Sequence, residues 1–110
     1  LTEKLAPLES RMQLPRLRDG AEHSFMMYPV VLRDQPKNGL VNHLENCGIE
    51  TRAMLPLVNQ PIYKKMGVNE DDFPNAKWIN QSGFYVGCHQ GLNGADLDYV
   101  ARKFFDFFNK

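Results

Sequence analysis

The sequence of 110 residues predicts an α+β domain, in which helices cover a small three-stranded, mainly antiparallel sheet. Apolar runs at residues 25–32 and 84–86, together with an alternating run at residues 49–55, predict the three strands. The segments around these runs place apolar residues at helical spacing. Because a chain of this length builds one core, we expect a single domain, too short for a doubly wound sheet with its own active-site crevice.

The first 22 residues carry the weakest pattern. Leu1, Leu5 and Leu8 follow helical spacing, but a proline between them interrupts the helix. Residues 11–22 mix proline, glycine and charges without a period, which favours a surface loop. We therefore expect residues 1–22 to be only partly ordered.

The first predicted strand is apolar on both of its alternating faces, so it is buried on two sides or has one face that awaits another domain. Pro29 lacks an N–H group and therefore favours an edge position for this strand. Asp34 follows the strand and is expected to cap the next helix.

A helix followed at once by a strand occupies the middle of the sequence. Leu40, Leu44 and Cys47 recur at helical spacing, and Gly48 stands where a helix end favours a positive φ. Beyond the glycine, alternation predicts a strand with one buried face. That face carries Ile49, Thr51, Ala53 and Leu55. Arg52 therefore points to the opposite side.

Two more helices are predicted in the second half of the sequence. One begins at residues 72–74 and ends before Gly83. The other begins at Asn93, and Asp96 is placed to complete a reciprocal cap. Its apolar arc includes Phe104, Phe105, Phe107 and Phe108. Because this arc is wider than three strands can cover, we expect another element or domain to pack there.

Composition excludes several classes of function. Lys and Arg total 13 and Asp and Glu total 13, and no basic run is interleaved with aromatic residues, so we expect no nucleic-acid partner. No apolar stretch is long enough for a membrane span and no signal peptide is recognisable, so we expect a cytoplasmic protein without a membrane partner. Cys47 and Cys88 lack metal-site spacing, and we expect reduced thiols and no metal.

The residues that carry chemistry form no recognisable catalytic set. His43 lies on the polar side of its helix and is expected to be solvated. Cys88 and His89 are strand neighbours that face opposite sides, so they do not form a thiol and base pair. Lys64 and Lys65 have no apolar surroundings to lower a pKa. The residues alone therefore predict a domain without a self-contained active site.

A series of short motifs, taken together, resembles one enzyme family. The motifs, in chain order, are His23-Ser24-Phe25-Met26-Met27-Tyr28, Leu44-x-x-Cys47-Gly48-Ile49-Glu50-Thr51-Arg52, Gln60-Pro61-Ile62-Tyr63, Gly83-Phe84-Tyr85-Val86-Gly87-Cys88-His89-Gln90-Gly91-Leu92 and Asp98-Tyr99-Val100. Their order and approximate spacing are similar to the DegT/DnrJ/EryC1/StrS family of nucleotide-sugar aminotransferases. The resemblance runs from His23 to the C-terminus.

The resemblance implies an enzyme of fold type I that depends on pyridoxal 5′-phosphate and is usually a homodimer. Such an enzyme moves an amino group from glutamate to a nucleotide-linked ketosugar, in the biosynthesis of lipopolysaccharide, other cell-surface polysaccharides or secondary metabolites. The chain resembles only the small C-terminal domain, so residues 1–22 are expected to connect to a missing large domain. The Schiff-base lysine and the cofactor site belong to that large domain, and the fragment alone is expected to be inactive.

The same resemblance assigns substrate-binding positions to four residues, which are His23, Tyr28, Arg52 and His89. Two departures affect the sugar contacts: Met26 stands where many members have His, and Gly87-Cys88 replaces a common Leu-Pro. Two alternatives remain open. One is a 3-dehydratase of the same family, in which His replaces the lysine, and the other is a non-catalytic α+β binding module.

Overall fold

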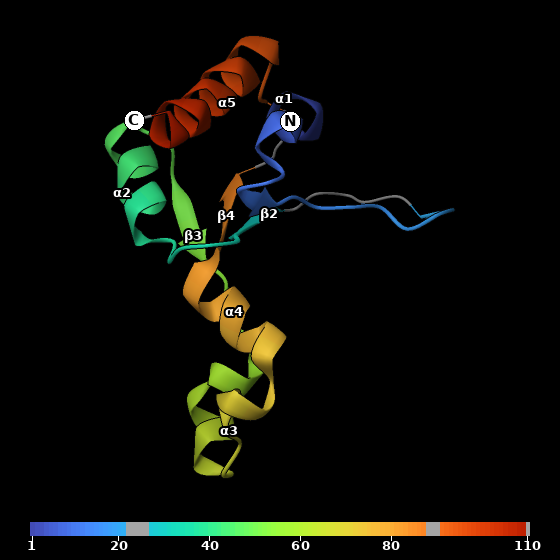
Figure 1. The fold of residues 1–110 in the computed structure, drawn as a ribbon, viewed down its shortest axis with the longest axis vertical. Coiled ribbons are helices and arrows are strands. Elements are labelled where there is room, and N and C mark those ends of the chain that lie inside the picture. The colour runs from blue at the N-terminus through green and yellow to red at the C-terminus, as the bar shows by residue number, and fades with distance from the viewer. Residues whose placement is uncertain (22–26, 88–90, 110) are drawn as a thin grey trace.

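A computed structural model describes residues 1–21, 27–87 and 91–109. The described helices are α1 (Thr2–Leu5), α2 (Asn38–Asn46), α3 (Pro61–Lys65), α4 (Pro74–Ser82) and α5 (Gly94–Phe108), with single 3-10 turns at Ala6–Leu8, Leu57–Asn59 and Glu70–Asp72. The described strands are β1 (Met12–Gln13), β2 (Met27–Leu32), β3 (Thr51–Ala53) and β4 (Gly83–Gly87). Figure 1 shows their arrangement.

The strands form one sheet in the order β1-β2-β4-β3, and each neighbouring pair among the described strands is antiparallel. This confirms the predicted α+β class, with one strand more than expected. The sequence placed β1 in a loop, because a strand of two residues has no alternation to detect. β2 lies between β1 and β4, so it is not an edge strand along its whole length as predicted. Among the described residues, β1 pairs with Val31 and Leu32 alone, so Pro29 lies in a part of β2 that β1 does not reach. That position suits a residue without an N–H group.

The core lies between one face of the sheet and the helices α1, α2 and α5. Its fully buried side chains from the strands are Met12, Val30, Leu32 and Phe84, and those from the helices are Leu5, Leu40, Leu44 and Phe104. The rings of Phe84 and Phe104 stack with centroids 6.3 Å apart, which fixes α5 against the central strand. Burial of this apolar surface is the main stabilising contribution to the fold.

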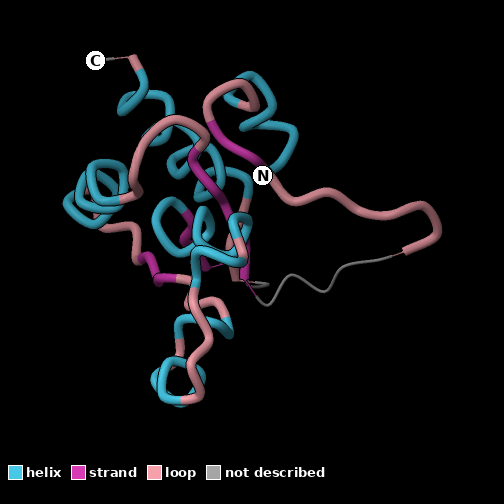
Figure 2. The backbone as a smooth tube through the Cα atoms, turned by 60° about the horizontal axis from the view of Figure 1, so that its bottom comes forward, coloured by secondary structure: helices cyan, strands magenta, loops and turns pink. Residues whose placement is uncertain are grey.

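The N-terminal segment belongs to this core, which the sequence did not indicate. Leu5, Leu8, Met12 and Leu14 are all buried. α1 and β1 are too short to show a period, so their contribution depends on tertiary packing. Residues 15–21 lead away from the compact part of the molecule, as both views show (Figure 1 and Figure 2).

The junction between α2 and β3 follows the prediction closely. Gly48 has φ of 82°, and the N–H groups of Gly48 and Ile49 donate to the carbonyls of Glu45 and Leu44 at the helix end. The Glu45 carboxylate also accepts hydrogen bonds from the hydroxyl and backbone N–H of Thr51, at 2.7 and 2.8 Å. These two bonds lower the pKa of Glu45 below its ordinary value. The start of α2 differs from the prediction, because the cap position is Lys37 without a side-chain hydrogen bond and not Asp34.

α5 confirms its predicted capping box, since Asn93 and Asp96 bond each other's backbone N–H groups. α1 and α2 pack against its phenylalanines, in line with the expectation of another element there, and Phe105, Phe107 and Phe108 remain half-buried. Phe107 lies 5.7 Å from the ring of His43, and Phe108 lies under the guanidinium of Arg11 at 4.9 Å. The prediction of a solvated His43 is wrong, because its Nε2 atom is 2.8 Å from the carbonyl oxygen of Lys103.

α4 is fixed to the end of β2 and to the segment that follows it. The Trp78 indole N–H donates to the carbonyl of Leu32 at 2.8 Å, and the Ser82 hydroxyl donates to the carbonyl of Gln35 at 2.9 Å. From this attachment, residues 55–77 form an arm that carries α3 and extends away from the sheet (Figure 1). The arm exposes large apolar side chains, which are Leu55, Leu57, Ile62, Met66 and Phe73.

The predicted buried face of the third strand is shorter than expected. Ala53 is exposed, and Leu55 is 56% exposed because β3 ends at Ala53 and the chain turns into the arm.

None of the helices in the described ranges is long and apolar enough to span a bilayer.

Candidate functional site: an open sheet face with Arg52

The strand register decides which side chains share a face of the sheet. Arg52 is opposite Tyr85, and Tyr85 is opposite Pro29, so these three side chains project to the same side. Tyr28 is opposite Val86 and projects to the packed side, where both are 2% exposed. We call the side that carries Met27, Pro29, Arg52 and Tyr85 the open face. The helices α1, α2 and α5 leave it uncovered.

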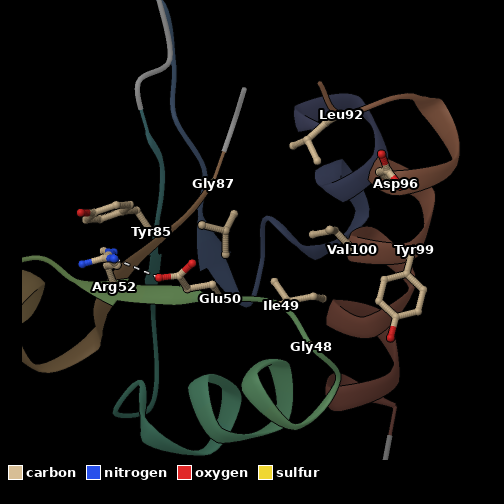
Figure 3. Close-up of a pocket in the computed structure, with 11 residues that line it drawn as sticks. Gly48, Ile49, Glu50, Arg52, Tyr85, Gly87, Leu92, Asp96, Tyr99 and Val100 are labelled. Carbon is tan, nitrogen blue, oxygen red and sulfur yellow. Dashed lines mark hydrogen bonds and ion pairs between the residues drawn. The ribbon is translucent and has the colours of Figure 1, made fainter. Parts of the chain in front are cut away.

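A hollow of about 430 Å³ begins on the open face and passes the ends of β3 and β4 toward α5 (Figure 3). Arg52, Glu50 and Tyr85 form one end of the hollow, and α5 forms the other. The remaining lining residues are Gly48, Ile49, Val86, Gly87, Leu92, Asp96, Tyr99 and Val100. The hollow thus combines an apolar wall with a charged end.

Arg52 holds its guanidinium at the charged end with one weak partner. Its Nη2 atom donates to Oε1 of Glu50 at 3.0 Å. The two side chains are 67% and 74% exposed, and an ion pair in such contact with water contributes little to stability. The guanidinium is therefore free to exchange Glu50 for another anion. Its planar fork matches a carboxylate or a phosphate through paired hydrogen bonds.

The polar groups at the α5 end already have partners within the fold. The Tyr99 hydroxyl donates to the carbonyl of Cys47 at 2.7 Å, and Arg102 and Lys103 lie over its ring. The Asp96 carboxylate is occupied by the capping box. These groups tie α5 to the end of α2 and shape the hollow.

The four substrate positions assigned by resemblance do not all meet in this hollow. Arg52 lies in it, on β3. Tyr28 lies on β2 with its hydroxyl 2.7 Å from Oγ1 of Thr2, on the packed side of the sheet. The structure therefore does not bring Tyr28 and Arg52 together. His23 and His89 lie outside the described residues.

Tyr85 is the residue of this site that sequence reasoning missed. Its strand was predicted, but its place beside Arg52 depends on the pairing of β3 with β4, which are more than 30 residues apart in sequence. The available signal was the alternation Phe84-Tyr85-Val86, in which the middle residue faces away from its two apolar neighbours.

The described residues of the hollow do not fit a complete pyridoxal phosphate site. No lysine is among its lining residues, so the hollow offers no amine to join to the cofactor. Lys64 lines a separate hollow in the arm. Within the described ranges, no three His, Cys, Asp or Glu side chains are gathered as a metal site would require. The hollow offers one guanidinium, the phenol of Tyr85 and an apolar wall, beside the carboxylates of Glu50 and Asp96 and the already bonded phenol of Tyr99.

Comparison with known proteins identifies relatives that match most of the chain. The chain is 27% identical over 103 residues to the lipopolysaccharide biosynthesis protein RfbH of Salmonella typhimurium, covering 88% of this chain and 24% of that protein. It is 30% identical over 102 residues to GDP-perosamine synthase of Caulobacter vibrioides, covering 89% of this chain and 27% of that protein. The chain thus spans about a quarter of the length of these relatives.

Solved structures share its fold. A DegT DnrJ EryC1 StrS aminotransferase from Brucella abortus matches with a TM-score of 0.80 and 22% identity, covering 98% of this chain and 29% of that one. The model of the DegT/DnrJ/EryC1/StrS aminotransferase family matches residues 1–105. This chain belongs to the DegT/DnrJ/EryC1/StrS aminotransferase family.

Proposed function

We propose that the chain is the small C-terminal domain of a pyridoxal-phosphate-dependent enzyme that transfers an amino group from glutamate to a nucleotide-linked ketosugar. The supporting observation is an open sheet face with an exposed, weakly paired Arg52, in a chain that belongs to a sugar aminotransferase family. The matched relatives are about four times longer than their matched segments, which leaves room for a large domain. One of them is a lipopolysaccharide biosynthesis protein, so we propose a role in making sugars for cell-surface polysaccharides.

In this proposal the chain binds and orients the substrate. Arg52 holds a carboxylate of glutamate or a phosphate of the nucleotide sugar. Its guanidinium can do so because its ion pair with Glu50 is exposed and weak. His23 and His89 are further candidates for substrate contacts. Tyr28 also remains a proposed contact of the full-length protein, although in this chain its hydroxyl is paired with Oγ1 of Thr2.

The cofactor would be held by the large domain, which supplies the lysine that the described residues of this hollow lack. When bound, pyridoxal phosphate acts as an electron sink that stabilises the carbanion formed at the reacting carbon. We further propose that the complete enzyme is a cytoplasmic homodimer, as the family resemblance implies.

The decisive experiment follows nitrogen through the reaction. The full-length protein is incubated with pyridoxal phosphate, glutamate labelled with ¹⁵N, and a panel of nucleotide-linked ketosugars, and the products are analysed by mass spectrometry. We expect a labelled amino sugar that requires glutamate in the mixture. A reaction in which the sugar loses a hydroxyl group and gains no nitrogen supports the 3-dehydratase instead. No change in any sugar, with pyridoxal phosphate bound or not, supports a non-catalytic binding module.

A further inference from the structure

We propose that Tyr85 is a second substrate-binding residue, which acts together with Arg52 on the same anionic group. This inference rests on the proposed function for the identity of its ligands, and on the described geometry for the site itself. Tyr85 is at the centre of the sheet, because β4 pairs with both β2 and β3. Its direct cross-strand neighbours on the open face are Arg52 on one side and Pro29 on the other.

Among the described residues, the Tyr85 hydroxyl has no hydrogen-bond partner. Tyr85 is half-buried and makes no side-chain hydrogen bond within the described ranges, whereas Tyr28 and Tyr99 on the same domain both have hydroxyl partners. A tyrosine whose ring is partly buried ordinarily finds a partner for its hydroxyl. The ring lies beside the Arg52 guanidinium (Figure 3), so a ligand that reaches the guanidinium also reaches the phenol.

Tyr85 also separates two hollows of the open face. One is the hollow that contains Arg52, and the other is an apolar hollow of about 430 Å³ between β4, the end of β3 and α4. The apolar hollow is lined by Met27, Ala53, Met54, Leu55, Pro56, Ala76, Ile79 and Tyr85. The position between them suits a ligand that has an anionic group for Arg52 and an uncharged part that packs on the ring.

The chemistry fits a carboxylate or a phosphate. Both accept several hydrogen bonds, so each can take two from the Arg52 fork and a third from the Tyr85 hydroxyl. Glutamate carries the carboxylate and the nucleotide sugar carries the diphosphate. The same site recognises only one of them in a single binding event, and the two probes below distinguish the sources.

The test measures binding to the full-length protein by calorimetry, with L-glutamate and inorganic pyrophosphate as separate probes. Tyr85→Phe removes the hydroxyl and keeps the ring, so the fold is retained. We expect the dissociation constant for one probe to rise about tenfold, as for the loss of a hydrogen bond to a charged group, with no change for the other. Tyr63→Phe is the matched control, because Tyr63 is half-buried on α3 and does not line the hollow. It should bind both probes as the unmodified protein does.

The inference is overturned if Tyr85→Phe binds both probes with unchanged affinity, or if the unmodified protein binds neither. The probe whose affinity falls identifies the source of the anion. Failure of the proposed function would give a different result from failure of this inference. In that case the unmodified protein binds an anion through Tyr85 but transfers no nitrogen from glutamate to a ketosugar.

Discussion

Gly48 illustrates how a single residue determines the path of this chain. It carries φ of 82° between α2 and β3, and the space where a Cβ atom would stand is open. The cost of a substitution is therefore conformational and not steric. This position determines the direction in which β3 leaves the helix, and so the place of Arg52.

Gly48→Ala should lower the free energy of unfolding by about 1–2 kcal/mol, because an L-residue is strained in the left-handed region. Chemical denaturation of the chain measures the change. Gly94→Ala is the control, because Gly94 lies in the first turn of α5 and a Cβ atom there also meets open space. It should be neutral or slightly stabilising. Equal effects of the two substitutions would contradict this account of the junction.

At the scale of elements, two hydrogen bonds between Glu45 and Thr51 join the last turn of α2 to the first residue of β3. Both hydrogen bonds favour the ionised carboxylate, which is why the pKa of Glu45 is lowered. A carboxyl group whose folded-state pKa is lowered stabilises the fold above its unfolded pKa, near 4.3. That contribution is lost as the pH falls through the folded-state pKa.

Thr51→Val removes the hydroxyl donor and leaves the backbone N–H, so the Glu45 pKa should rise toward its ordinary value without reaching it. NMR titration of the Glu45 side chain measures this. Thr51→Ser keeps the donor and should keep the lowered pKa. The stability difference between the unmodified chain and Thr51→Val should shrink below about pH 4, because protonated Glu45 no longer favours the bond. An unchanged Glu45 pKa in Thr51→Val would show that the Thr51 hydroxyl does not lower it.

The elements that sequence reasoning found are those specified by neighbouring residues. The cap of α5 is contained within residues 93–96, and the end of α2 is marked by Gly48, so both were predicted correctly. β1 was missed because its two residues become a strand only when Val31 and Leu32 lie beside them. The contacts of His43 with Lys103 and Phe107 likewise depend on α2 and α5 meeting across about 60 residues.

The site shows the same limit. Arg52 was placed on its own side of β3 by alternation alone. Tyr85 and Tyr28 were not placed correctly relative to it, because strand register decides which of two neighbouring strand positions faces a given side.

At the scale of the whole molecule, most of the large apolar side chains that are exposed among the described residues lie on the arm. The side chains concerned are Leu55, Leu57, Ile62, Met66 and Phe73. Soluble monomers rarely expose such clusters without a partner. In the proposed enzyme, another domain or subunit would cover them.

The chain alone should therefore self-associate through the arm, and sedimentation over a wide concentration range measures it. Ile62→Lys combined with Met66→Lys places two charges one helical turn apart on the arm and should shift the chain toward monomer. Leu17→Lys is the control, because Leu17 is equally exposed but lies outside the arm. An unmodified chain that stays monomeric at all concentrations would count against the arm as a contact surface.

The most direct test of the central claim, that the open face at Arg52 binds substrate, is Arg52→Lys in the full-length protein. Lysine keeps the charge and loses the planar fork, and the exposed pair with Glu50 contributes little to the fold. We predict that kcat/KM falls by about tenfold or more, roughly 1.4 kcal/mol, for glutamate or for the nucleotide sugar, while the melting temperature hardly changes. Unchanged kinetics with both substrates and a lower melting temperature would show that Arg52 is structural and that the open face is not the substrate site.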